Sequence, residues 1–154
     1  MKPSIHAIVS ISLGALFWYF SKSFYAGALC AAVGIFVDID HILEYLIHYG
    51  GKGFTIRRFL HVFHEMLFDR LYVFFHSAEI VIILWIAASF TQNIYAFAAA
   101  LGISTHLILD FIGNPLHFFS YFLLRRIARG FKTDVLVKNN HPLTLKRKRH
   151  GKKP

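Results

Sequence analysis

The chain has 154 residues, of which 56% are hydrophobic and 16% are charged, and its formal net charge is +9. A soluble domain carries about 25% charged residues, so this chain has too few polar side chains to cover a soluble enzyme. The 17 Phe and 7 Tyr exclude disorder for most of the chain, and the single cysteine, Cys30, excludes a disulfide scaffold. A small integral membrane protein remains.

Four apolar segments have the length, or nearly the length, of membrane-spanning helices. They are Ile5–Phe20, Phe24–Val37, Leu71–Phe90 and Ile94–Gly113. A spanning helix needs roughly 20 predominantly apolar residues. The last two segments supply that number, and the first two reach it if their polar ends lie in the headgroup region. The pattern predicts an all-α fold with four transmembrane helices.

Two further stretches have the pattern of helices that lie in the membrane surface. In Phe54–Arg70, apolar residues recur at helical spacing and most charged residues fall on the other side, which is typical of an interfacial amphipathic helix. Leu116–Arg129 is apolar and then basic, and it predicts a second interfacial or re-entrant helix. We therefore expect a helical membrane domain over residues 1–135 and a basic, disordered cytoplasmic tail over residues 136–154.

The Lys and Arg residues are unequally divided between the two sides of the membrane. With four antiparallel spans, sixteen of the 17 lie on the side that holds both termini, and only Lys22 lies on the other. Positive charges near spans accumulate on the cytoplasmic side. We therefore expect a multi-pass protein of the inner (plasma) membrane with both termini in the cytoplasm.

Most acidic and histidine side chains lie within or beside the apolar segments, where a buried charge is expensive. From the first segment to the fourth they are His6; Asp38, Asp40 and His41; His76, Ser77 and Glu79; and His106 and Asp110. The starts of odd-numbered spans and the ends of even-numbered spans meet at one membrane face. All four segments therefore deliver these groups to the cytoplasmic layer.

Imidazole and carboxylate groups at one depth are ligands that suit zinc, iron, manganese or nickel. His106 and Asp110 are i,i+4 neighbours on one helix face, and Asp38 and His41 are i,i+3 neighbours. An ion with three protein ligands and an open position makes water acidic enough to react at neutral pH. The convergence of four segments thus predicts a metal site.

Each of these groups also has a plain structural interpretation. A lone intramembrane His such as His6 can hydrogen-bond between helices. HxxxD can form an intrahelical hydrogen bond, and DxDH can cap a helix at the interface. Other polar groups are interpreted as solvated, namely His61, His64 and Glu65 on the surface helix and His141 and His150 in the tail, while His117 is left open.

The order of the motifs resembles a known family. A His early in the first span, DxDH closing the second, HS opening the third and HxxxD near the end of the fourth resemble the bacterial membrane-bound, metal-dependent hydrolase family, over residues 1–115. That family is distantly similar to zinc-dependent phospholipase C. The resemblance implies a divalent metal cofactor, zinc before other metals, with one to three ions. The metal-site residues it implies are His6, Asp38, Asp40, His41, His76, His106 and Asp110.

The function expected from these observations is hydrolysis of a phosphoester, such as a lipid headgroup or a nucleotide-like substrate, by metal-activated water at the cytoplasmic face. Asp40 and Glu79 are the candidates for orienting that water or acting as its base. Basic residues at Arg57–Arg70 and Arg125–Lys132 would attract an anionic substrate. One alternative is an intramembrane metal-ion or proton transporter. Another is a structural membrane protein whose basic tail holds anionic lipid, nucleic acid or a protein partner.

Overall fold

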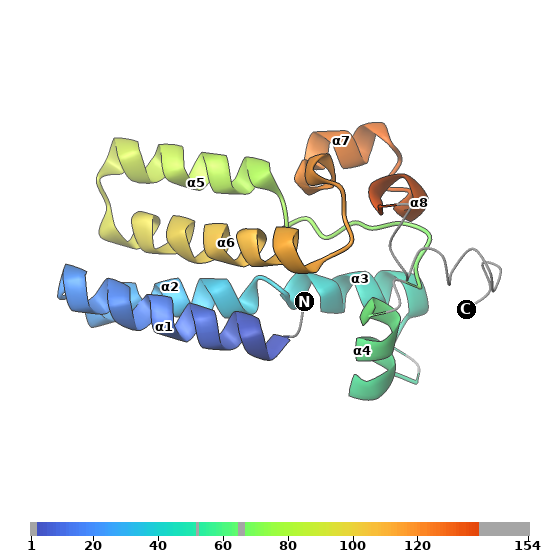
Figure 1. Ribbon diagram of the computed structural model, residues 1–154, viewed down its shortest axis with the longest axis horizontal. Coiled ribbons are helices and arrows are strands. Elements are labelled where there is room, and N and C mark those ends of the chain that lie inside the picture. The colour runs from blue at the N-terminus through green and yellow to red at the C-terminus, as the bar shows by residue number, and fades with distance from the viewer. Residues whose placement is uncertain (1–2, 52, 65–66, 139–154) are drawn as a thin grey trace. The chain divides into compact units, whose positions relative to one another are not determined.

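The computed structural model describes residues 3–51, 53–64 and 67–138, and within these ranges the chain forms helices and no strand. The predicted all-α class is confirmed (Figure 1). The chain divides into two compact units. Unit 1 comprises residues 1–38 and 75–114, and unit 2 comprises residues 39–74 and 115–154. The predicted tail falls almost entirely on residues 139–154, outside the described ranges.

Unit 1 consists of two helical hairpins. Its helices are α1 (Pro3–Ser21), α2 (Phe24–Phe36), α5 (Ala78–Thr91) and α6 (Ile94–Gly113). The first hairpin turns at Lys22 and the second at Gln92, and both residues have a left-handed backbone, with φ of 56° and 51°. The next residue caps the following helix: the Ser23 side chain accepts a hydrogen bond from the Ala26 amide, and Asn93 caps α6 in the same way. Each hairpin therefore closes with a two-residue turn.

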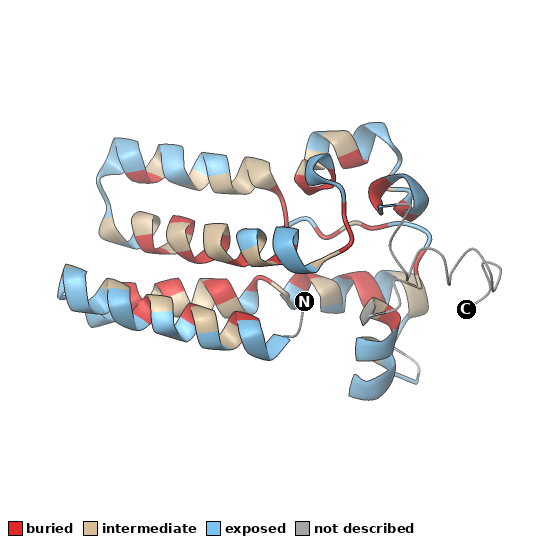
Figure 2. Cartoon of the chain, in the orientation of Figure 1, coloured by how far each residue is buried: buried red, intermediate tan, exposed pale blue. Residues whose placement is uncertain are grey.

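Within unit 1, α2 packs against both α1 and α6, and α5 packs against α6. The contact faces follow an i,i+4 spacing, which places side chains on one helix face. The buried positions on these faces are His6, Ser10 and Gly14 of α1, Ala26, Cys30 and Gly34 of α2, and Ala98, Gly102, His106 and Asp110 of α6 (Figure 2). On α1 and α6, small residues thus occupy one part of the face and polar residues the other, whereas the face of α2 consists of small residues.

The small residues let the helices approach closely. A Cβ atom at Gly102 would lie 2.4 Å from the Cys30 carbonyl oxygen, and one at Gly34 would lie 2.4 Å from the Ser10 hydroxyl. Helix packing in membranes depends on such small residues, because lipid gives no hydrophobic drive for association. The α2 backbone therefore lies directly against α1 and α6.

Three helical stretches are long and apolar enough to cross a membrane. They are Pro3–Ser21, Ile94–Gly113 and Phe24–Tyr49, in which α2 is followed after two turn residues by α3. The fourth apolar helix, α5, has 14 residues, or about 21 Å at 1.5 Å per residue. These helices account for the four apolar segments of the sequence.

Helix α5 begins at Ala78 and not at Leu71, where the apolar segment starts. The residues before it are not helical because their backbone groups bind elsewhere. The Leu71 amide donates to the Phe131 carbonyl oxygen at 2.8 Å. The Arg126 guanidinium donates to the carbonyl oxygens of Tyr72 and Val73 at 3.0 and 2.7 Å. Hydropathy alone does not reveal these distant partners.

Unit 2 is built from short helices around a small core. These are α3 (Ile39–Tyr49), α4 (Ile56–His64), the 3₁₀ helix η1 (Phe118–Tyr121), α7 (Leu123–Ala128) and α8 (Thr133–Leu136). The interfacial helix predicted over Phe54–Arg70 is shorter, and the one predicted over Leu116–Arg129 is divided into η1 and α7. Helix α3 was not predicted as a separate element. Its buried residues include Glu44 and Tyr45.

Candidate metal centre

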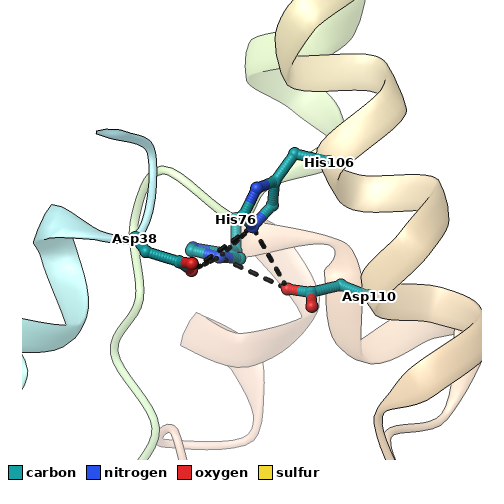
Figure 3. A group of neighbouring side chains, drawn as sticks. All are labelled: Asp38, His76, His106 and Asp110. Atoms are coloured by element: carbon teal, nitrogen blue, oxygen red, sulfur yellow. Dashed lines mark hydrogen bonds and ion pairs between the residues drawn. The ribbon is translucent and has the colours of Figure 1, made fainter. Parts of the chain in front are cut away.

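Four of the predicted site residues come together in unit 1. His106 and Asp110 lie one turn apart on α6, Asp38 lies in the turn after α2, and His76 lies in the non-helical segment before α5. Figure 3 shows the two α6 side chains directed toward Asp38 and His76. One atom from each residue, all within 4.8 Å of one another, forms the group we call the four-atom cluster.

The four-atom cluster consists of Asp38 Oδ1, His76 Nε2, His106 Nε2 and Asp110 Oδ2. His76 Nε2 lies 3.1 Å from Asp38 Oδ1, 3.1 Å from His106 Nε2 and 3.3 Å from Asp110 Oδ2. His106 Nε2 lies 3.3 Å from Asp38 Oδ1 and 3.6 Å from Asp110 Oδ2. In a tetrahedral zinc site with bonds of 2.0–2.2 Å, neighbouring ligand atoms are about 3.3–3.6 Å apart. The measured separations are close to that spacing.

The orientation of the His106 ring is set by Nδ1, the ring nitrogen that is not part of the four-atom cluster. Nδ1 lies 2.8 Å from the Gly34 carbonyl oxygen, so Nδ1 carries the hydrogen and donates it. In the neutral ring, Nε2 then presents a lone pair to the cluster. A backbone carbonyl that holds the far nitrogen is a common way to orient a metal-binding histidine. The close approach of α2 to α6 at Gly34 and Gly102 allows this contact.

Each imidazole Nε2 of the cluster faces more atoms than it has hydrogens to donate. The distances lie in hydrogen-bond range, but His76 Nε2 faces three atoms and has at most one hydrogen. His106 Nε2 faces the same two carboxylates and His76. One cation between the four atoms would contact all of them. Buried His and Asp groups thus lie within metal-binding distance of one another.

Access to the cluster is uneven. The side chains of His76, His106 and Asp110 are at most 5% exposed, whereas that of Asp38 is 34% exposed. Burying a carboxylate away from water is costly without a compensating partner. The imidazoles that surround Asp110 supply that compensation. Asp38 is therefore the one member of the four-atom cluster that is partly exposed.

His6 belongs to the same region but is not one of the four-atom cluster. Its Nε2 lies 3.2 Å from Asp110 Oδ1, the oxygen that does not face His76 and His106. The His6 ring also stacks on the His106 ring with centroids 4.2 Å apart. His6 therefore contacts Asp110 and His106 without contributing an atom to the four-atom cluster.

The other predicted site residues are not part of the four-atom cluster. Asp40 and His41 are on α3 in unit 2, where Asp40 is buried and His41 Nδ1 lies 3.8 Å from Glu44 Oε2. Asp38 lies in the turn directly before α3 and not within a helix. Glu79 lies in the first turn of α5 and is partly buried. The parts that Asp40, His41 and Glu79 play in a metal site remain predictions.

Two buried charges were not recognised as structural from the sequence. Glu44 Oε1 accepts a hydrogen bond from the Tyr72 amide at 2.6 Å. Arg126, expected to form part of an exposed basic rim, is 1% exposed and binds backbone carbonyls. Arg125 and Arg126 are adjacent between Leu124 and Ile127, and this pattern gives no sign of which Arg is buried. Arg125, Arg129 and Lys132 remain partly or fully exposed.

Comparison with protein-family models, with curated proteins and with solved structures finds no match to this chain.

Proposed function

We propose that this chain is a membrane-embedded, metal-dependent hydrolase that binds a divalent ion, zinc before other metals, at Asp38, His76, His106 and Asp110. The observation that supports the proposal is the four-atom cluster, in which each imidazole nitrogen lies 3.1–3.6 Å from both carboxylate oxygens and the two nitrogens lie 3.1 Å apart. His6 would support Asp110 through its second oxygen. The resemblance of the motif order to the membrane-bound hydrolase family favours the same assignment.

The proposed reaction is hydrolysis of a phosphoester. A bound divalent ion supplies Lewis acidity and lowers the pKa of a water molecule. The partly exposed Asp38 side chain leaves one side of the cluster open to a substrate. Glu79, three residues after His76, is proposed to orient the water or accept its proton, with Asp40 as the other candidate. Exposed basic residues such as Arg57 and Arg58 would concentrate an anionic substrate.

The proposed location is the inner membrane, with the cluster near the cytoplasmic face. This proposal is based on the distribution of Lys and Arg. Lys22 is the one basic residue on the side of the membrane that holds the turns of the two hairpins. A lipid headgroup or a nucleotide-like phosphoester is the substrate class that such a position favours.

Metal-ion transport is a second candidate, because the four-atom cluster lies among apolar helices. Ionisable side chains within membrane helices often mark an ion pathway. Ion uptake by proteoliposomes separates this candidate from hydrolysis.

The first test is the metal content of detergent-purified protein. Elemental analysis should find about one or more equivalents of a divalent metal in the wild-type protein. Asp110→Asn, which keeps the shape of the side chain, should reduce the content to background. His117→Ala changes an exposed histidine in unit 2 and is the matched control that should keep the metal. Wild-type protein without metal, even after incubation with zinc, would contradict the proposal.

The second test separates the two candidate functions. Metal-loaded protein should hydrolyse bis(p-nitrophenyl) phosphate, and a chelator or Asp110→Asn should abolish the activity. Zinc uptake into proteoliposomes without any hydrolysis would instead favour the transporter. Glu79→Gln should retain metal and lose activity if Glu79 handles the proton. Unchanged activity in that variant would exclude this role.

A further inference from the structure

Three aromatic rings form a cluster at the surface of unit 2. The ring centroids of Phe118 and Phe119 are 5.3 Å apart, and Phe122 lies 5.8 and 6.2 Å from them. Phe118 and Phe119 are 54% and 57% exposed. Segments that lie in the membrane interface carry Trp, Phe and Leu on the face that enters the bilayer.

Helix α7 extends this apolar surface. Leu124 and Ile127, which are i,i+3 neighbours on one helix face, are 70% and 54% exposed. Large aliphatic side chains so exposed mark a contact surface when they adjoin other apolar groups. Together with the aromatic cluster they form the surface that we call the η1–α7 patch, which consists of Phe118, Phe119, Phe122, Leu124 and Ile127.

Positive charge borders the η1–α7 patch. The Arg125 guanidinium lies over the Phe119 ring, 5.3 Å from its centroid. Arg129 and Lys132 are exposed, whereas Arg126 is buried and bound to backbone carbonyls. An apolar surface bordered by Arg and Lys is the composition of segments that bind anionic bilayers.

The chain keeps the patch near a membrane. Helix α6, one of the candidate spans, ends at Gly113, and η1 begins at Phe118. Five residues reach at most about 17 Å, and a 20-residue helix is about as long as the hydrocarbon layer is thick. The connection therefore keeps Phe118, the first residue of the patch, within about that distance of the end of α6.

We propose that the η1–α7 patch is an interfacial lipid-binding surface: its Phe, Leu and Ile side chains enter the acyl boundary, and Arg125, Arg129 and Lys132 bind anionic headgroups. This proposal is independent of the metal centre. The partner is a bilayer that contains acidic phospholipid, and binding there would hold unit 2 at the membrane surface.

The test uses full-length protein with Cys30→Ala, in nanodiscs of phosphatidylcholine and phosphatidylglycerol. An environment-sensitive fluorophore is attached to Phe119→Cys or Leu124→Cys, and Lys138→Cys, at an exposed polar position, is the matched control. Nitroxide-labelled lipid should quench the first two labels strongly, and aqueous iodide should quench only the label at position 138. Efficient iodide quenching at positions 119 and 124 would overturn the proposal. Labels shielded from both quenchers would overturn it in favour of a contact with another part of this chain or with a second copy.

The charge requirement has its own test. Nitroxide-labelled phosphatidylglycerol should quench the label at position 119 more than labelled phosphatidylcholine does. Arg125→Gln with Arg129→Gln should lower that preference, by up to about fivefold per charge removed. Lys22→Gln, in the turn of the first hairpin, should leave it unchanged. An unchanged preference in the double variant would overturn the role of the two arginines.

Discussion

His106 is held on two sides, and only one of these contacts follows from its neighbours in the sequence. The i,i+4 relation to Asp110 is visible in HxxxD, whereas the Gly34 carbonyl that orients Nδ1 lies 72 residues away. That contact exists because Gly34 and Gly102 allow the two backbones to approach. The sequence therefore predicts which side chains collect at one depth. It does not predict which atom of each faces the centre, because that depends on helix rotation and spacing.

His6 provides a test of how the centre is supported. His6→Phe keeps an aromatic ring against His106 but removes the donor to Asp110, and it should weaken metal binding by about 10–100-fold. His6→Gln places an amide N–H near the position of Nε2 and should restore most of the affinity. Competition with a chromogenic chelator gives the affinities. Equal affinity in wild type and His6→Phe would contradict a supporting role.

A ligand count separates this role from direct coordination. X-ray absorption of the zinc-loaded protein should show two imidazoles in wild type and the same two in His6→Gln. Three imidazoles in wild type, falling to two in the variant, would make His6 a ligand, as the family resemblance implies.

At the scale of helices, the same faces carry both packing and chemistry. Along α6 the spacing of four runs from Ala98 through Gly102 to His106 and Asp110. This pattern of small residues leading into polar residues was present in the sequence and could have identified the contact faces. Helix ends were harder to predict. The backbone of residues 71–73 binds distant partners such as Phe131 and Arg126, so α5 starts only after this segment.

Gly34→Ala should show how tight the contact between α1 and α2 is. The new Cβ atom would lie 2.4 Å from Ser10 Oγ, and overpacking of this kind costs about 1–3 kcal/mol. The melting temperature in detergent should fall by several degrees, and adding Ser10→Gly should recover much of the loss. Gly51→Ala, where no heavy atom lies within 4 Å of the new Cβ, is the control. Equal melting temperatures for the Gly34 and Gly51 variants would refute the tight contact.

Arg126→Leu should release the segment that precedes α5. The variant leaves the carbonyl oxygens of Tyr72 and Val73 without their buried donor, at a cost of about 1–3 kcal/mol. Hydrogen exchange should increase in peptides that cover residues 67–77 and remain unchanged in α1. Arg129→Leu removes an exposed arginine and should change exchange little. Equal effects of the two substitutions would contradict the structural role of Arg126.

For the whole molecule, composition was sufficient to predict the class. High hydropathy and few charges led to an all-α membrane protein, because few other folds accommodate such a sequence. The division into two units was not predicted, since unit 2 combines segments that are distant in the sequence and individually short. Its helices α7 and α8 have six and four residues, which is too few for hydrophobic periodicity to be recognised.

The charge distribution makes a prediction about orientation. A reporter that is active only in the periplasm should be silent when fused at Pro154 and active when inserted between Gln92 and Asn93, in the turn between α5 and α6. A reporter that is active only in the cytoplasm should give the opposite pattern. Periplasmic activity at Pro154 would show that the termini face the other side.

The pairing of α2 with α6 has a consequence for biosynthesis. The two-residue turn at Lys22 and Ser23 lets α1 and α2 form a hairpin as soon as they are made, but the partner of Gly34 on α6 follows 72 residues later. At 5–20 residues per second, that interval lasts roughly 4–14 s. Throughout it, the nascent hairpin exposes His6 and Asp38 before His106 and Asp110 exist. During this interval the membrane-inserted first hairpin therefore carries the cost of these polar side chains, and the second hairpin reduces that cost when it arrives.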